Sequence, residues 1–217
     1  MESALDYCEL ADWRRRVAGL YAEVRAAPEA GRAIAWNEWR AGRNDLFQQH
    51  TQSPLTLQQR AAFRGLDYFS YDPSWRLPAD LETDLTGPHF RFELGEDGDF
   101  DMKRIGWVSF TVGGKRRRLA LYWIEGYGGG LFLPFKDLTN IRPPAGQGET
   151  YGGGRYLLDT IKGADLGSSA DRLMLDFNYA YNPSCAYHPR WACPLAPEEN
   201  TLPFAVTAGE KRYVAAA

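Results

Sequence analysis

The spacing of hydrophobic residues changes once along this chain, near residue 65. Before that point apolar residues recur at steps of three and four, which is the spacing of one face of an α-helix. Ser3 and Asp6 have the spacing of a capping box, and Pro28 cannot continue a helix. We therefore predict an amphipathic helix from Ser3 to just before Pro28, with an apolar face made of Leu10, Trp13, Val17, Leu20, Tyr21 and Val24.

Two further helices are predicted before residue 65. The first runs from Glu29 to Gln49, and Gly42 weakens its middle because glycine is a poor helix former. The second begins at Thr56, which has a capping-box partner in Gln59, and ends near Gly65. The residues expected to be buried on the longer of these two helices are Ile34, Trp36, Trp39, Leu46 and Phe47.

From Leu66 onward apolar residues alternate with polar ones, which is the pattern of half-buried β-strands. Asp97-Gly98 and Gly113-Gly114 are dipeptides typical of tight hairpin turns, so neighbouring strands are expected to pair in antiparallel fashion. The predicted strands lie within Trp75–Leu85, Phe90–Leu94, Trp107–Val112, Leu119–Ile124, Leu131–Phe135, Arg155–Ile161, Leu173–Phe177 and Leu202–Thr207.

This pattern predicts an α+β fold that is mainly antiparallel β: a barrel or curled sandwich with two or three N-terminal helices packed on it. We expect residues 1–65 to form the helical segment and residues 66–217 the β part of one compact unit. Residues 183–203 form a long loop with five prolines. A loop of this length is usually functional or disordered, and its aromatic content argues against disorder. We expect it to cover one end of the barrel as a lid or pocket wall.

Composition and charge restrict the classes of partner. The net charge is −3 with both signs interspersed, which gives no electrostatic basis for a nucleic-acid or anionic-membrane partner. No stretch approaches the roughly 20 apolar residues of a membrane span, and the acidic N-terminus is not typical of a secretory signal. We therefore expect a cytoplasmic protein whose three cysteines, an odd number, do not form a disulfide framework.

The run from Tyr151 through three glycines to Arg155 is the first candidate for a binding site. Consecutive glycines occur where the backbone needs a positive φ or where another group approaches closely. One interpretation is a nest of backbone amides that faces an anionic group, with Arg155 as a forked donor. The alternative is the entrance of a bulged strand, with Arg155 paired to Asp159 or Asp176.

Cys185 and Cys193 flank His188 in the proline-rich loop. Four interpretations remain open: a zinc site, a disulfide, a nucleophilic Cys185 assisted by His188, and buried structural thiols. The zinc interpretation lacks a fourth ligand, and we predict no metal.

Carboxylates and polar side chains complete the candidate site. Glu199 lies in a proline-constrained loop, where apolar neighbours would suit it to acid–base catalysis, and Asp137 and Asp176 are alternative partners. The predicted catalytic residues are Glu199, Cys185 and Asp137. The residues expected to bind substrate are Tyr151, Arg155, Asn178, Tyr181, Asn182, Tyr187 and Asn200. For Asn178, Tyr181 and Asn182, capping a strand end and satisfying the loop backbone is an equally good alternative.

Five motifs resemble those of a known family. They are FLPFKDLT from Phe132, TYGGGRY from Thr150, DFNYAYNPSCAY from Asp176, CPLAPEEN from Cys193 and AGEK from Ala208. In these motifs the chain resembles the bacterial and archaeal domain-of-unknown-function family 1684, from about Trp39 to Lys211. The resemblance implies membership of that family but supplies no activity.

Together these residues favour an enzyme that acts on a small anionic molecule at the mouth of the barrel, without an organic cofactor. Hydrolysis, or other acid–base chemistry such as elimination or isomerisation, is the expected reaction. The alternative is a non-catalytic barrel that binds a small molecule in the same pocket. A third hypothesis is an interaction protein that forms a homodimer through helix residues such as Trp13 and Val17.

Overall fold

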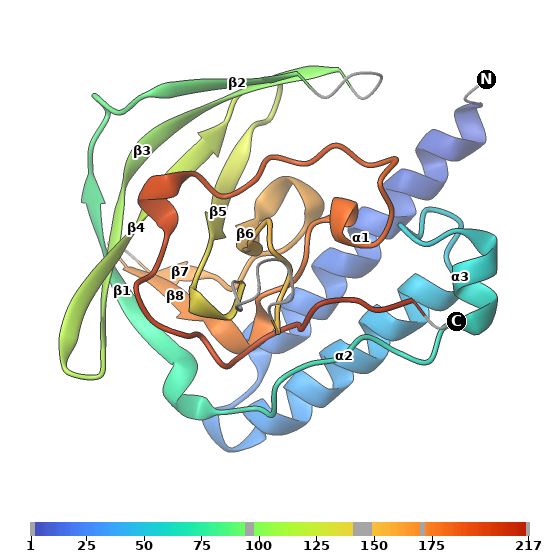
Figure 1. The fold of residues 1–217 in the computed structure, drawn as a ribbon, viewed down its shortest axis with the longest axis horizontal. Coiled ribbons are helices and arrows are strands. Elements are labelled where there is room, and N and C mark those ends of the chain that lie inside the picture. Colours follow the sequence, from blue (N-terminus) through green and yellow to red (C-terminus); the bar gives the residue numbers. More distant parts are fainter. Residues whose placement is uncertain (1–2, 94–97, 141–148, 170–171, 216–217) are drawn as a thin grey trace.

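The computed structural model describes residues 3–93, 98–140, 149–169 and 172–215. In this part of the chain, two long α-helices lie along an antiparallel sheet of eight strands that curls into a half-barrel, and a short third helix packs beside the second one (Figure 1). The predicted fold class, α+β and mainly antiparallel β, is therefore confirmed in its curled form.

The three helices are α1 (Ala4–Ala26), α2 (Arg32–Gln49) and α3 (Leu57–Ala62). Both predicted capping boxes are present, because the Ser3 and Thr56 side chains accept hydrogen bonds from the backbone three residues later. A short 3-10 turn at Glu29–Gly31 joins α1 to α2. Local sequence signals therefore fix where α1 and α3 begin, whereas α2, predicted from Glu29, begins at Arg32 without a side-chain cap.

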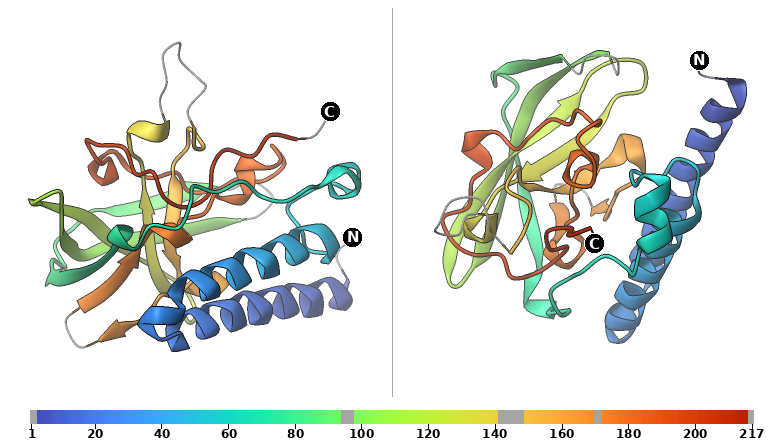
Figure 2. Two further views of the ribbon diagram at one scale, coloured as in Figure 1. Left: turned by 90° about the horizontal axis from the view of Figure 1, so that it is seen from below. Right: turned by 45° about the vertical axis from the view of Figure 1, so that its right-hand side comes forward.

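The helices α1 and α2 lie side by side along one face of the sheet (Figure 2). Val17 and Tyr21 from α1 and Trp39 from α2 share one hydrophobic core with residues of the sheet. The prediction that Ile34 is buried is wrong, since its exposed fraction is 63%. Ile34 lies two positions before Trp36, and two helical positions are about 200° apart, so the two side chains point to opposite sides.

The two helix residues named in the homodimer hypothesis pack within the chain. Trp13 packs within the chain against Phe47 and His50, with ring centroids 6.0 and 5.3 Å apart, and Val17 is buried. Val17 is therefore inaccessible to a partner, whereas Trp13 is only partly buried. A homodimer stays a prediction.

The sheet has the strand order β6-β5-β4-β3-β1-β8-β7, and β2 pairs with β3 outside this path. Its strands are β1 (Arg76–Thr83), β2 (His89–Glu93), β3 (Asp99–Val112), β4 (Lys115–Ile124), β5 (Gly130–Phe135), β6 (Arg155–Asp159), β7 (Ser168–Ser169) and β8 (Arg172–Asp176).

Both predicted hairpins occur. Gly113 and Gly114 have positive φ angles at the turn between β3 and β4. Strands β2 and β3 pair in antiparallel register, although Leu94 and Asp97 of the predicted strand end and turn lie outside the described residues.

Two strand predictions are wrong. Residues 202–207 form no strand, and their neighbourhood contributes only isolated bridges, such as the one between Lys136 and Thr201. Pro203 lacks an N–H group and cannot donate to a ladder, which is one reason that the alternating pattern there is not extended into a strand. Conversely, residues 168–169 form the short strand β7, which is not among the predicted strands.

Candidate functional site

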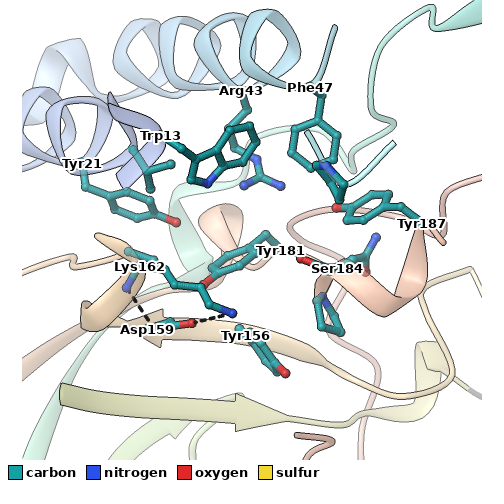
Figure 3. Close-up of a pocket in the computed structure, with 15 residues that line it drawn as sticks. Trp13, Tyr21, Arg43, Phe47, Tyr156, Asp159, Lys162, Tyr181, Ser184 and Tyr187 are labelled. Carbon is teal, nitrogen blue, oxygen red and sulfur yellow. Dashed lines mark hydrogen bonds and ion pairs between the residues drawn. The ribbon is translucent and has the colours of Figure 1, made fainter. Parts of the chain in front are cut away.

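A small pocket lies between the two long helices and the sheet (Figure 3). Its volume is about 70 Å³. Its walls come from helices α1 and α2, the end of β6 and residues 181–187, and they carry six aromatic rings, two cationic side chains and one carboxylate. The lining residues described below include Trp13, Tyr21, Arg43, Asp159, Tyr181 and Tyr187.

A buried ion pair connects the pocket wall to the C-terminal part of the chain. Arg43 Nη2 donates to Glu210 Oε2 at 2.9 Å, and both side chains are almost completely buried. Glu210 also accepts hydrogen bonds from the Tyr187 hydroxyl and from Asn182, at 3.2 Å from the backbone N and 3.0 Å from Nδ2. Burial raises the pKa of Glu210, and the nearby Arg43 opposes that rise. These hydrogen bonds offset part of the cost of removing two charges from water.

Aromatic rings enclose the rest of the Arg43 guanidinium. Its central carbon lies 5.0, 5.2 and 5.1 Å from the ring centroids of Trp39, Phe47 and Tyr181, which is cation–π distance. Nε donates to the Tyr68 hydroxyl at 3.0 Å. Among the described residues no hydrogen bond uses Arg43 Nη1. Because Arg43 also lines the pocket, its guanidinium keeps one nitrogen for a further acceptor.

Asp159 ends β6 and brings a carboxylate to the pocket. It is buried and accepts a hydrogen bond from the backbone N of Lys162 at 3.2 Å. The Lys162 ammonium lies 3.8 Å from Asp159 Oδ2 (Figure 3), but its side chain is 54% exposed and provides only a screened counter-charge. Burial consequently raises the pKa of Asp159, as expected for a carboxylate that loses hydration without a buried partner.

Two buried polar atoms on the pocket residues have no hydrogen-bond partner within the described part of the chain: the Tyr21 hydroxyl and Asn182 Oδ1. Figure 3 shows the Tyr21 hydroxyl directed into the pocket. Burial raises the pKa of Tyr21, so this group stays protonated and can donate. Native proteins contain few unpaired buried polar groups, and each one calls for an explanation.

Cys185, Cys193 and Tyr151 form a second cluster. The backbone N of Cys185 donates to Cys193 Sγ at 3.4 Å, and the Tyr151 hydroxyl donates to Cys185 Sγ at 3.5 Å. All three residues are partly exposed, and the cysteines are free thiols. Hydrogen bonds from the Cys193 thiol and then from Tyr151 lower the pKa of Cys185 to about 6 against the opposing effect of burial. The same contact raises the pKa of Cys193.

The surroundings of Cys185 bear on two of the four interpretations of these cysteines, namely assistance by His188 and a zinc site. His188 accepts a hydrogen bond from the backbone N of Arg190 at 3.2 Å, and no described contact joins it to Cys185. Within the described residues, no three His, Cys, Asp or Glu side chains come together as metal ligands. The predicted absence of a metal stays a prediction, as does a nucleophilic Cys185, and no described contact supports assistance by His188.

Arg155 lies in the core and does not face an anionic ligand. It is completely buried, and Nη2 donates to Asp137 Oδ2 at 2.8 Å and to the carbonyl of Val206 at 3.0 Å. Asp137 also accepts from the backbone N of Thr139 and of Val206. The partner of Arg155 is thus neither Asp159 nor Asp176, and this pair fastens the extended segment after residue 200 to the end of β5. The predicted roles of Arg155 in substrate binding and Asp137 in catalysis therefore find no open surface here.

Glu199 lies apart from both clusters. Its carboxylate accepts hydrogen bonds from Arg104 Nη1 at 2.7 Å and from the Tyr122 hydroxyl. Arg104 also donates to Asp84 at 2.9 Å. Glu199 is therefore held by a network of hydrogen bonds, and neither it nor its partners Arg104 and Tyr122 line the pocket.

The side chains of Asn178 and Asn200 both satisfy backbone groups of other segments. The Asn178 side chain exchanges hydrogen bonds with the backbone of Asp72, at 3.0 and 2.9 Å. The Asn200 amide bonds to the N–H and carbonyl of Ala120 and to the carbonyl of Pro134. It thereby occupies the place of a strand where β4 and β5 diverge.

The structure brings together only part of the predicted site. Tyr181, Asn182 and Tyr187 contribute to the pocket, whereas Tyr151 and Cys185 meet at the thiol cluster. Sequence reasoning missed Arg43, Tyr21 and Glu210. The AGEK motif contains Glu210 and was the one available signal, but nothing local indicates that this carboxylate is buried.

The motif resemblance is tested by comparison with known families. A model of the family described as "Protein of unknown function (DUF1684)" matches residues 61–211, more than half of the chain. The chain belongs to the DUF1684 family. The DUF1684 match begins at residue 61, later than the expected start near Trp39. Asn182 and Glu210 lie within the match, whereas Tyr21 and Arg43 lie in the helices that precede it.

A solved structure of similar sequence supports the fold. The solution NMR structure of an uncharacterised protein from Haloarcula marismortui is 32% identical to this chain, with a TM-score of 0.56. The similarity covers 81% of this chain and 91% of that one. No match was found among curated proteins. Among the described residues, no helix of this DUF1684 chain has the length and apolar character needed to cross a membrane.

Proposed function

We propose that this protein binds a small polar molecule in the pocket between α1, α2 and β6. The observation that carries the proposal is the pair of unpartnered buried atoms, the Tyr21 hydroxyl and Asn182 Oδ1, on a pocket that also contains Arg43. Leaving a buried donor or acceptor unpaired costs about 1–3 kcal/mol each. A ligand that satisfies both atoms would recover this free energy on binding.

The donors and acceptors suggest the chemistry of the ligand. Arg43 Nη1 and the Tyr21 hydroxyl are donors suited to a carboxylate, and Arg43 is close enough to affect the pKa of Tyr21. Asn182 Oδ1 requires a donor, such as a hydroxyl or an amine. Typical ligand pockets have volumes of about 300–1,000 Å³, so a pocket of about 70 Å³ suits only a short molecule. A small hydroxy acid or amino acid meets these conditions.

Binding is tested by calorimetry with glycolate, lactate, glycine and alanine, and with acetate as the probe that lacks the second donor group. The native protein is expected to bind at least one of the first four probes more tightly than acetate. Tyr21→Phe is expected to weaken that binding about tenfold, the effect of losing roughly one hydrogen bond to a charged group.

Tyr71→Phe is the matched control, because the Tyr71 hydroxyl is also buried without a described partner but does not line this pocket. Neither substitution is expected to lower the free energy of unfolding, since each removes an unsatisfied group. The proposal is wrong if the native protein binds none of the probes, or if Tyr21→Phe binds them as tightly as Tyr71→Phe.

Catalysis in the same pocket is a second candidate, and the raised pKa of the buried Asp159 favours it. Such a carboxylate can exchange a proton with a bound ligand during acid–base chemistry. Asp159→Asn would then abolish turnover while leaving binding intact. Hydrolase activity through Glu199 or Cys185, as expected from the sequence, stays a prediction that Glu199→Gln and Cys185→Ser test in the same assay.

A further inference from the structure

The two cysteines of the proline-rich segment have complementary environments. Cys185 lies in a 3-10 turn, Ser184–Ala186, and receives the Tyr151 hydroxyl on its sulfur. Cys193 Sγ lies 3.4 Å from the backbone N of Cys185. Because an N–Cα bond is about 1.5 Å, the Cys193 sulfur is within about 5 Å of the Cys185 Cα. Forming a bond between the two sulfurs therefore requires side-chain rotation and little movement of the backbone.

We propose that Cys185 and Cys193 are a redox-active dithiol that exchanges with low-molecular-weight disulfides. Cys185 is the attacking sulfur, because it is partly exposed and holds the hydrogen bond from Tyr151. Cys193 is the resolving sulfur. This activity is separate from ligand binding in the pocket and uses neither Arg43 nor Asp159.

The environments match the requirements of each step. A thiol attacks fastest when its pKa lies near the ambient pH, and the lowered pKa of Cys185, about 6, provides thiolate at neutral pH. The raised pKa of Cys193 keeps its sulfur protonated until the resolving step. Cys8 has no such environment, since it is exposed on α1.

An external disulfide is the oxidant in this reaction. The Cys185 thiolate attacks one sulfur of the external disulfide, a mixed disulfide forms, and one thiolate leaves. Cys193 then loses its proton to that thiolate or to water and attacks the Cys185 sulfur, which expels the second thiol. The protein dithiol is oxidised by two electrons to one disulfide, and the external disulfide is reduced to two thiols.

The test uses the full chain in buffers of reduced and oxidised glutathione, followed by rapid alkylation and mass spectrometry of the intact protein and its peptides. A Cys185–Cys193 disulfide is expected to form reversibly as the proportion of oxidised glutathione rises. Cys193→Ser is expected to trap glutathione on Cys185, and Cys8→Ser is expected to behave like the native chain.

Alkylation kinetics of the native protein keep the proposal testable even if Cys193→Ser fails to fold. The rate at Cys185 is expected to rise with a midpoint near pH 6 and to exceed the rate at Cys8 at least tenfold at pH 7. Tyr151→Phe is expected to move that midpoint to higher pH, a change that a merely structural role of the tyrosine would not produce. If Cys185 reacts no faster than Cys8 and no intramolecular disulfide forms at any glutathione ratio, the dithiol assignment is wrong.

Discussion

Asp176 is a buried carboxylate with a distant counter-charge. Its side chain accepts hydrogen bonds from Asn178 N at 3.1 Å and Asn178 Nδ2 at 2.8 Å. The nearest cation, Arg76, is 3.7 Å away. Burial therefore dominates and raises the pKa of Asp176 from 3.8 to about 6. A raised carboxyl pKa means that the folded state holds the proton more tightly than the unfolded chain does.

This shift predicts a contribution to stability that depends on pH. The contribution of Asp176 is fully present below its unfolded pKa, near pH 4, and is lost as the pH rises through about 6. Asp176→Asn keeps an acceptor for Asn178 but removes the ionisation. We expect it to raise the free energy of unfolding at pH 7 by up to about 3 kcal/mol, with little change at pH 4.

Urea unfolding at pH 4, 5, 6 and 7 measures this difference. Asp80→Asn on the neighbouring strand is the control, because Asp80 is exposed and pairs with the exposed Arg172 at 3.0 Å. Exposed pairs contribute about 0–1 kcal/mol. Equal effects of Asp176→Asn at all four pH values would contradict the assignment.

At the scale of elements, sequence signals succeed where they are local. The capping boxes at Ser3 and Thr56 involve residues three positions apart, so the helix starts are visible without the fold. The segment after residue 200 was predicted incorrectly, because its conformation depends on contacts with distant residues. Its alternating pattern resembles a strand, but the Asn200 side chain occupies the hydrogen-bonding position beside Ala120 that a strand would take.

The same reasoning explains the partly predicted site. The motif residues Tyr181, Asn182 and Tyr187 were found because a run of aromatic and amide side chains is unusual in a loop. The burial of Arg155 could not be inferred, because its partner Asp137 and the carbonyls it binds come from other segments. Whether an arginine faces a ligand or the core depends on tertiary packing alone.

The glycine triplet before β6 provides a prediction at this scale. Gly154 has a φ of +96°, and an added Cβ would lie 2.6 Å from the carbonyl oxygen of Phe135. Gly154→Ala is therefore expected to lower the free energy of unfolding by about 1–3 kcal/mol. Gly152 has open space around it and no positive φ, so Gly152→Ala is expected to be neutral or slightly stabilising.

Denaturant unfolding of the two variants distinguishes the close contact of Gly154 with the Phe135 carbonyl from the amide-nest interpretation. A nest that binds an anion would make both substitutions affect ligand binding and neither affect the stability of the unliganded protein. In a tight turn, the Gly154 N–H donates to the backbone carbonyl of Tyr151, here at 3.0 Å. This interpretation predicts that only Gly154→Ala lowers the stability of the unliganded protein.

At the scale of the whole molecule, the Arg43–Glu210 pair joins α2 to the extended C-terminal segment. Replacing either residue by Met leaves the other charge buried without its partner, which costs about 3–5 kcal/mol. The double variant is expected to be less destabilised than the sum of the two single changes, because it leaves no unpaired charge.

Equilibrium unfolding of the three variants gives this coupling free energy directly. The exposed pair Arg15–Asp12, with 2.8 Å between its atoms, provides a reference cycle with an expected coupling below about 1 kcal/mol. Additive effects at Arg43 and Glu210 would show that the pair does not connect the helices to the C-terminal segment energetically.

The separation of Arg43 and Glu210 along the chain also has a consequence during synthesis. The carboxylate is made 167 residues after the arginine. At typical elongation rates of about 5–20 residues per second, the nascent helix waits roughly 10–30 s for its counter-charge. The pairing that holds α2 to the C-terminal segment can therefore form only after Glu210 has left the ribosome. Until then the aromatic rings around Arg43 stay accessible to chaperones.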